Sequence, residues 1–147
     1  EKLVSLGRRT ADKERNPLAR PDDQRLIRHA YDLHKAHEHG FDFSKIGGTV
    51  KAIVEHDRQQ FKAQHSELAN NAIEEITFGL SKILTDPEHK RRFERMVVPL
   101  VYGTGETPKF DAIAESLVSI CQAVGFDLGA QLLNDRALEA KAQAANA

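Results

Sequence analysis

The sequence has no tryptophan, a single cysteine and no long apolar run. One cysteine excludes an internal disulfide, and its place at the end of the apolar run Leu117–Cys121 indicates a buried thiol in a reducing compartment. No apolar stretch approaches the roughly 18 residues that a membrane-spanning helix requires, and no signal-like segment is visible at the amino end. We therefore expect a cytoplasmic protein that does not contact a membrane.

An excess of positive charge is also absent. Lys and Arg total 21 against 22 acidic residues, a net charge of -1, so the chain as a whole does not attract nucleic acid. A local basic stripe could still contact a nucleic-acid backbone, although Glu88 and Glu94 dilute it. The members of this stripe are Lys90, Arg91, Arg92 and Arg95. We interpret the stripe as a solvated helix face and keep nucleic-acid binding as an alternative.

Strand signals are weak throughout. No run of alternating β-branched residues persists, and the apolar residues recur at helical spacing. The pattern predicts an all-α fold, an irregular bundle of about five to seven helices. The segment Asn16–Pro21 ends a first helix, because proline supplies no amide donor. A second helix is predicted to begin at Asp22 and Asp23, whose carboxylates suit a helix N-terminus, and to end at Gly40.

The rest of the chain is predicted from helix periodicity and turn residues. Phe41 and Phe43 are expected to fill the core beside the second helix. Residues 65–72 are polar and read as a connection, and residues 73–84 form a short helix or an irregular apolar segment. Asp86 followed by Pro87 marks a helix start. Further helices are predicted at 50–64, 87–102 and 109–124, with a loop at 103–108 and an alanine-rich end that should fray.

Lys2 on the first helix and Asp32 on the second are the candidate functional pair. A nucleoside triphosphate needs cations against its phosphates, and a carboxylate can help to hold a metal ion or position an incoming hydroxyl. The alternative is that Lys2 is solvated and that Asp32 pairs with Arg28, four residues earlier on the same helix. Residue types alone favour this alternative.

Four histidines on the second helix suggest a metal site only superficially. They are His29, His34, His37 and His39. No cysteine accompanies them, and the H-E-x-x-H spacing of a zinc site does not occur. We predict imidazoles that titrate, and no metal ligands in this chain.

The order of several motifs resembles the carboxy-terminal half of the AbiEii/AbiGii nucleotidyltransferase toxin family, over residues 1 to about 120. The amino end combines Lys2, an Arg at 8 or 9, and a motif in which Arg28 precedes Tyr31 and Asp32. Further matches are His56 and Phe61 on one helix, the segments 84–87 and 93–96, and the segment 108–113.

The resemblance implies roles for three residues. Lys2 corresponds to the essential lysine of the family, which contacts nucleotide phosphates. Asp32 corresponds to the aspartate of its last catalytic motif, where it orients Lys2 or acts on the acceptor. Arg28 matches the basic residue four positions earlier and would bind nucleotide. Many relatives carry an acid at the position of His29.

The resemblance also implies a larger protein, a toxin of a toxin-antitoxin or abortive-infection system. It would transfer a nucleoside monophosphate from an NTP to an acceptor such as tRNA, with Mg2+ held mainly by paired aspartates of an amino-terminal domain. Residues 1–15 would then lie at the interface with that domain, residues 16–147 would form the carboxy-terminal helical domain, and this chain alone would be inactive. Its partners would be its own amino-terminal domain and a cognate antitoxin. The alternative is a stand-alone helical interaction module, antitoxin-like or the ligand domain of a regulator.

Overall fold

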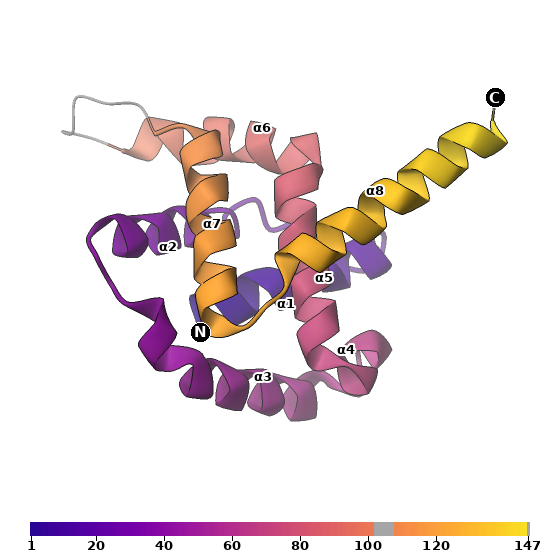
Figure 1. Cartoon of the computed structure of the whole chain (residues 1–147), viewed down its shortest axis with the longest axis horizontal. Coiled ribbons are helices and arrows are strands. Elements are labelled where there is room, and N and C mark those ends of the chain that lie inside the picture. The colour runs from indigo at the N-terminus through magenta and orange to yellow at the C-terminus, as the bar shows by residue number, and fades with distance from the viewer. Residues whose placement is uncertain (102–107, 147) are drawn as a thin grey trace.

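The computed structural model describes residues 1–101 and 108–146, with the backbone alone at 133–138. These residues form eight α-helices, two short 3-10 helices and no strand (Figure 1). The all-α prediction is confirmed, whereas the predicted number of helices, five to seven, is too low. The elements are α1 (Lys2–Arg15), α2 (Arg28–Glu38), η1 (Phe43–Ile46), α3 (Gly47–Phe61), α4 (Ser66–Asn70), α5 (Ala72–Thr85), α6 (Pro87–Met96), η2 (Val98–Leu100), α7 (Phe110–Val124) and α8 (Leu128–Ala145).

Helix α5 lies at the centre of the molecule. The sequence predicted either a short helix or an irregular apolar segment here. Asn71 begins this helix by accepting a hydrogen bond from the Glu74 amide, 3.2 Å away. Ile76, Leu80 and Ile83 are fully buried along it. The preceding residues, predicted to be a connection, contain the short helix α4. The sequence does not reveal α4, because its residues are mostly polar and only Leu68 is buried in the core.

Helix α1 packs most extensively on α5. The two helices cross at Gly7 and Gly79, and a β-carbon at Gly7 would lie 2.6 Å from Cγ2 of Ile76. Real side chains do not approach so closely, so the crossing depends on the absence of a side chain at both positions. No pattern in the sequence indicates this contact, because it joins glycines on two separate helices.

The second helix begins later than the sequence predicts. Residues 24–27 form a turn, and α2 starts at Arg28 without a side-chain cap. The two aspartates expected at its start have other partners. Asp23 pairs with Arg9 on α1, and Asp22 pairs with Arg92 on α6. Ion pairs between elements therefore hold both carboxylates, and Asp23 also caps the turn locally by accepting a hydrogen bond from the Arg25 amide at 3.0 Å.

The two phenylalanines after α2 behave differently. Phe43 is buried as predicted, but Phe41 remains 51 % exposed and packs edge-on against Phe43, with ring centroids 4.8 Å apart. The prediction for Phe41 is therefore wrong, since the short η1 turns only one of the two rings inward.

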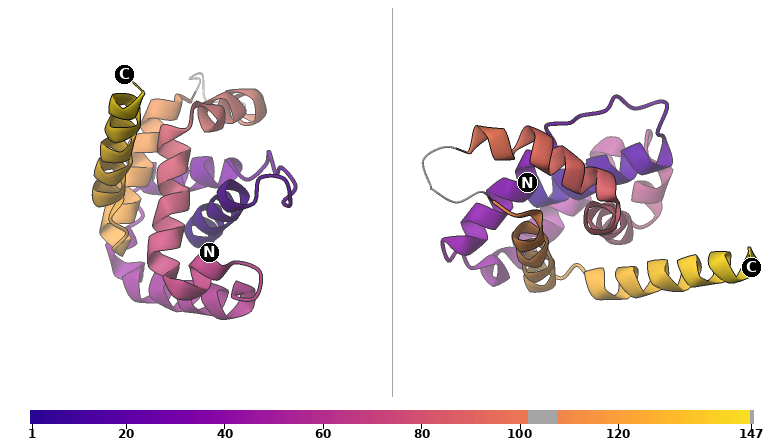
Figure 2. Two further views of the ribbon diagram at one scale, coloured as in Figure 1. Left: turned by 90° about the vertical axis from the view of Figure 1, so that its right-hand side faces the viewer. Right: turned by 90° about the horizontal axis from the view of Figure 1, so that it is seen from above.

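The closing helices are largely as predicted. Helix α6 starts at the Asp86 cap and Pro87 but ends at Met96, because the chain tightens into η2 around Pro99. The predicted loop at 103–108 lies mostly outside the described residues. Helix α7 ends at Gly125, whose φ of 96° is the left-handed conformation that favours glycine. Helix α8 continues to Ala145 where the sequence predicts fraying, and its far half projects from the body (Figure 2). Within the described ranges, no helix is long and apolar enough to cross a membrane.

A charged network is buried where α1, α4 and α5 meet. The guanidinium of Arg15 donates to both oxygens of Glu75, at 3.1 and 3.2 Å. Nε2 of His65 lies 3.3 Å from the same carboxylate, close enough for an ion pair but not aligned as a hydrogen bond. Glu75 is only 4 % exposed, and its bond to Arg15 raises the pKa of that guanidinium.

Glu75→Gln is expected to lower the free energy of unfolding by about 1–3 kcal/mol. The amide keeps the shape of the side chain but leaves Arg15 and His65 without their counter-charge. Urea unfolding followed by circular dichroism measures the loss, with Glu115→Gln on an exposed turn of α7 as the matched control. Equal midpoints for the two variants would contradict a stabilising role of this network.

Cys121 is buried in the core as the sequence predicts. Burial raises the pKa of its thiol to about 12, and the thiolate is the form that reacts with alkylating reagents. We expect iodoacetamide at pH 8 to modify the folded chain at least about 10³-fold more slowly than the chain unfolded in guanidinium. Mass spectrometry of quenched samples checks this ratio. Complete labelling of folded protein within minutes would be incompatible with the buried position.

Candidate functional site

Lys2 and Asp32 form an ion pair between neighbouring helices. Burial of Leu3 and Val4 fixes the face that α1 turns inward, and burial of Leu33 does the same for α2. The polar neighbours of these residues are left on the surface, where Nζ of Lys2 lies 2.6 Å from Oδ2 of Asp32. The structure thus brings together the two residues that the sequence singled out.

The alternative pairing within α2 does not form. Arg28 lies one turn before Asp32, is exposed, and makes no side-chain ion pair among the residues that the structure describes. Asp32 is instead held by the lysine of the other helix. The guanidinium of Arg28 remains on the same surface, outside the two hollows that border the ion pair.

Polar and charged residues make up most of the lining of the first hollow, the polar hollow, which has a volume of about 760 Å³. It lies between α1 and α3, with Lys2, Arg8, His29 and His56 in its lining. Nε of Arg8 donates to Oδ2 of Asp57 at 3.0 Å, and its guanidinium carbon stands 3.8 Å above the centroid of the Phe61 ring. These contacts hold Arg8 rigidly in the wall of the hollow.

His29 stands beside Lys2 at the edge of the polar hollow. Its Nδ1 atom is buried and has no hydrogen-bond partner in the described part of the chain. Burial lowers the pKa of this imidazole, and the positive charge of Lys2 lowers it further. His29 is therefore neutral at pH 7. The sequence predicted no role for His29.

The second hollow is apolar and has a volume of about 360 Å³. Asp32 and Lys2 lie at its rim, and the aromatic rings of Phe41 and Phe43 line it together with Val50. The exposed face of the Phe41 ring therefore forms part of the wall of this hollow. A flat apolar group, such as a nucleobase, is the kind of ligand that an aromatic lining of this type accepts.

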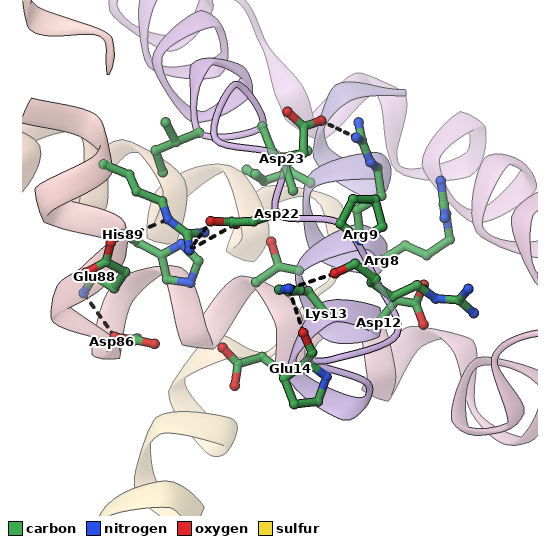
Figure 3. Close-up of a pocket in the computed structure, with 18 of the residues that line it drawn as sticks. Arg8, Arg9, Asp12, Lys13, Glu14, Asp22, Asp23, Asp86, Glu88 and His89 are labelled. Carbon is green, nitrogen blue, oxygen red and sulfur yellow. Dashed lines mark hydrogen bonds and ion pairs between the residues drawn. The ribbon is translucent and has the colours of Figure 1, made fainter. Parts of the chain in front are cut away.

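A third hollow, of about 460 Å³, contains neither Lys2 nor Asp32. It lies on the other side of α1, against the segment 17–27 and the start of α6 (Figure 3). Many of the side chains that line it are ionisable, among them Lys13, Glu14 and His89. It is more enclosed than the two hollows around the ion pair.

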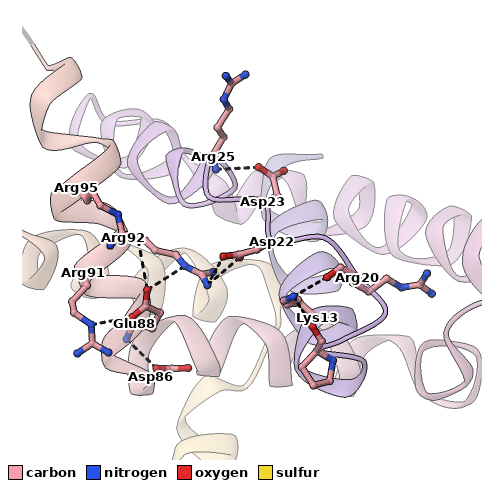
Figure 4. Close-up of polar contacts among 11 residues, drawn as sticks. Lys13, Arg20, Asp22, Asp23, Arg25, Asp86, Glu88, Arg91, Arg92 and Arg95 are labelled. Atoms are coloured by element: carbon pink, nitrogen blue, oxygen red, sulfur yellow. Dashed lines mark hydrogen bonds and ion pairs between the residues drawn. The ribbon is translucent and has the colours of Figure 1, made fainter.

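The basic stripe of α6, another candidate from the sequence, makes ion pairs within the protein. Arg91, Arg92 and Arg95 of the basic stripe each contact Glu88 on the same helix, and Arg92 also reaches Asp22 (Figure 4). Glu88 and Asp22 thus offset two of the four positive charges of the stripe, in keeping with a solvated helix face.

The histidines of α2 do not converge. His34 bonds Ser116 at 2.7 Å and lies 3.2 Å from Glu38, whereas the ring of His37 faces Phe43. Among the described residues, none of the four takes part in a cluster with metal-ligand spacing.

Residues 1–116 match the family model described as nucleotidyl transferase AbiEii toxin, type IV TA system. The chain belongs to this family. The match begins at α1, includes both Lys2 and Asp32, and ends within α7, so the AbiEii region contains the ion pair and the two hollows beside it. The resemblance seen in the sequence motifs is thereby confirmed. Comparison with curated proteins and with solved structures gave no match.

Proposed function

We propose that this chain is the carboxy-terminal helical part of a nucleotidyltransferase toxin, which transfers a nucleoside monophosphate from an NTP to an acceptor such as tRNA. The observation that carries the proposal is the ion pair of Lys2 and Asp32, exposed between two hollows. Membership of the AbiEii family supports the reaction class. The cytoplasm is the proposed location, and a cognate antitoxin the proposed partner.

In the proposed reaction Lys2 stabilises the negative charge on the phosphates as pyrophosphate leaves. Asp32 holds the ammonium in place through the 2.6 Å contact. Arg28, which has no ion-pair partner in the described ranges, binds an outer phosphate when the nucleotide arrives. Arg8 and the neutral His29 line the polar hollow in which the triphosphate lies.

Mg2+ would come with a preceding domain. Nucleotide-bound magnesium takes carboxylate and phosphate oxygens in an octahedral arrangement. Around the polar hollow both Asp32 and Asp57 are already paired, with Lys2 and Arg8, so these carboxylates do not fit that task. We propose that residues 1–15 contact an amino-terminal domain that holds the metal, and that the 147-residue chain alone is inactive.

The experiment is nucleotide transfer by the full-length gene product. Purified protein is incubated with Mg2+, each α-labelled NTP in turn, and total tRNA. We expect label on tRNA from one or a few nucleotides, loss of that label with Lys2→Ala, and full activity with Lys51→Ala, an exposed lysine of α3. Absence of transfer to RNA or protein, together with an unchanged phenotype of Lys2→Ala in cells, would overturn the proposal. A start codon just before Glu1 would favour the stand-alone interaction module.

A further inference from the structure

Three metal-ligating side chains meet in the third hollow from separate parts of the chain. Glu14 comes from the last turn of α1, Asp86 caps α6, and His89 lies in the first turn of α6 (Figure 3). One donor atom from each lies within 4.8 Å of the donor atoms of the other two. No spacing motif in the sequence indicates this cluster, because α1 and α6 are brought together only by folding.

Two side chains at this place have polar atoms that the protein leaves unused. His89 is only 9 % exposed, and its ring makes no hydrogen bond within the described residues. Thr10, one turn before Glu14, is 3 % exposed, and its hydroxyl also lacks a partner there. The Thr10 oxygen is shut off from solvent, and a buried polar atom of this kind is costly unless a ligand or water satisfies it. Both line the same hollow as Glu14 and Asp86.

The negative charge of the cluster is not compensated by neighbouring cations. Lys13 donates to the carbonyl oxygens of Pro17 and Arg20, Arg92 pairs with Asp22 and Glu88, and Arg9 pairs with Asp23. Neither Glu14 nor Asp86 has an ion pair in the ranges that the structure covers. One oxygen of Asp86 accepts the Glu88 amide at 2.9 Å, which leaves the other oxygen available.

We propose that Glu14, Asp86 and His89 bind one divalent first-row transition-metal ion. Imidazole nitrogen combined with carboxylate oxygen suits zinc, cobalt or manganese better than magnesium, which prefers oxygen alone. Metal bonds of about 2.0–2.2 Å require the three groups to move inward, and the exposed side chain of Glu14 is free to rotate.

The site would fasten the end of α1 to the start of α6. Lys2 stands at the opposite end of α1, so the ion would help to hold in place the helix that carries the lysine. This site is distinct from the magnesium proposed for the transfer reaction, and its occupancy can be measured without any activity.

The test is titration of the untagged 147-residue chain with Co2+, followed by visible absorption and competed by Zn2+. We expect one Co2+ per chain, displacement by Zn2+ but not by millimolar Mg2+, and a Tm higher by about 5 °C or more when zinc is saturating. Glu14→Gln and His89→Gln are each expected to weaken binding by tenfold or more. Glu14 is exposed, so its variant keeps the test valid even if His89→Gln folds poorly.

Matched controls decide between this site and unspecific binding. Glu94→Gln changes an exposed carboxylate of α6, and His39→Gln changes an exposed imidazole just after α2. Both should bind Co2+ as the unaltered chain does. The proposal is overturned if the chain binds no Co2+, if Glu14→Gln binds as tightly as the unaltered chain, or if His39→Gln is the variant that loses binding.

Discussion

Gly79→Ala is expected to lower the free energy of unfolding by about 3 kcal/mol or more, enough to prevent folding of a marginally stable domain. A β-carbon at Gly79 would overlap the carbonyl oxygen of Gly7 and lie 2.8 Å from its carbonyl carbon and 2.9 Å from the Ala11 amide nitrogen. All three atoms belong to the backbone of α1. Rotation of a side chain therefore cannot relieve the clash, and the two helices must move apart.

Separation of α1 from α5 would disturb most of the core. Leu6, Ile76 and Leu80 are fully buried at or beside this crossing, and loosening their packing leaves voids that cost further stability. Urea unfolding and thermal melts followed by circular dichroism measure the effect. Near-ultraviolet signals and tryptophan fluorescence are unsuitable here, because the chain has no tryptophan and few aromatic residues.

Gly48→Ala is the matched control. Gly48 lies in the first turn of α3, and a β-carbon there meets no atom within 4 Å. Alanine is the better helix former by about 0.5–1 kcal/mol, so this variant should equal or exceed the parent in stability. If Gly79→Ala unfolds at the same urea concentration as Gly48→Ala, this result would contradict the close crossing of α1 and α5.

Lys2→Ala is expected to lower kcat/KM of the full-length protein by about 10²–10³-fold, as loss of a group that stabilises transition-state charge does. Because the interaction grows as charge develops on the phosphates, most of the loss should fall on kcat rather than on KM. Lys51→Ala, which removes an exposed lysine of α3, controls for loss of positive charge. Initial rates with a labelled nucleotide measure both constants.

The contact between Lys2 and Asp32 predicts how their effects combine. Asp32→Asn should lower kcat by about 10–100-fold, because a small misplacement of a catalytic group is costly. If Asp32 acts by orienting Lys2, the double variant should be no slower than Lys2→Ala alone. Independent, multiplicative losses would instead mean that Asp32 acts on the acceptor, and unchanged rates in both single variants would remove the pair from the mechanism.

Circular dichroism of each variant separates these effects from misfolding. Lys2 and Asp32 are about half exposed, and an exposed ion pair contributes at most about 1 kcal/mol to stability. Their variants should therefore melt near the parent temperature. A large loss of stability would be unexpected for this surface pair and would point to a structural role.

The amino-acid sequence determined the fold class and several helix boundaries by itself. Helical spacing of apolar residues, Asp86 with Pro87, and Gly125 after α7 are local signals whose physics acts within one or two turns. The candidate residues Lys2 and Asp32 also came from the sequence, through the order of motifs around them. That order was sufficient to identify the family, which residues 1–116 confirm.

Tertiary structure decided the contacts between elements. Asp22 and Asp23 suit a helix start, but their carboxylates also form ion pairs with cations on α6 and α1. Arg28 lies one turn before Asp32 on the same helix, yet Asp32 pairs with Lys2, because α1 packs against α2. The glycine crossing, the buried Glu75 and the Glu14, Asp86 and His89 cluster share the same origin. Each joins residues distant in sequence, and such proximity follows from how helices pack, which local propensity does not encode.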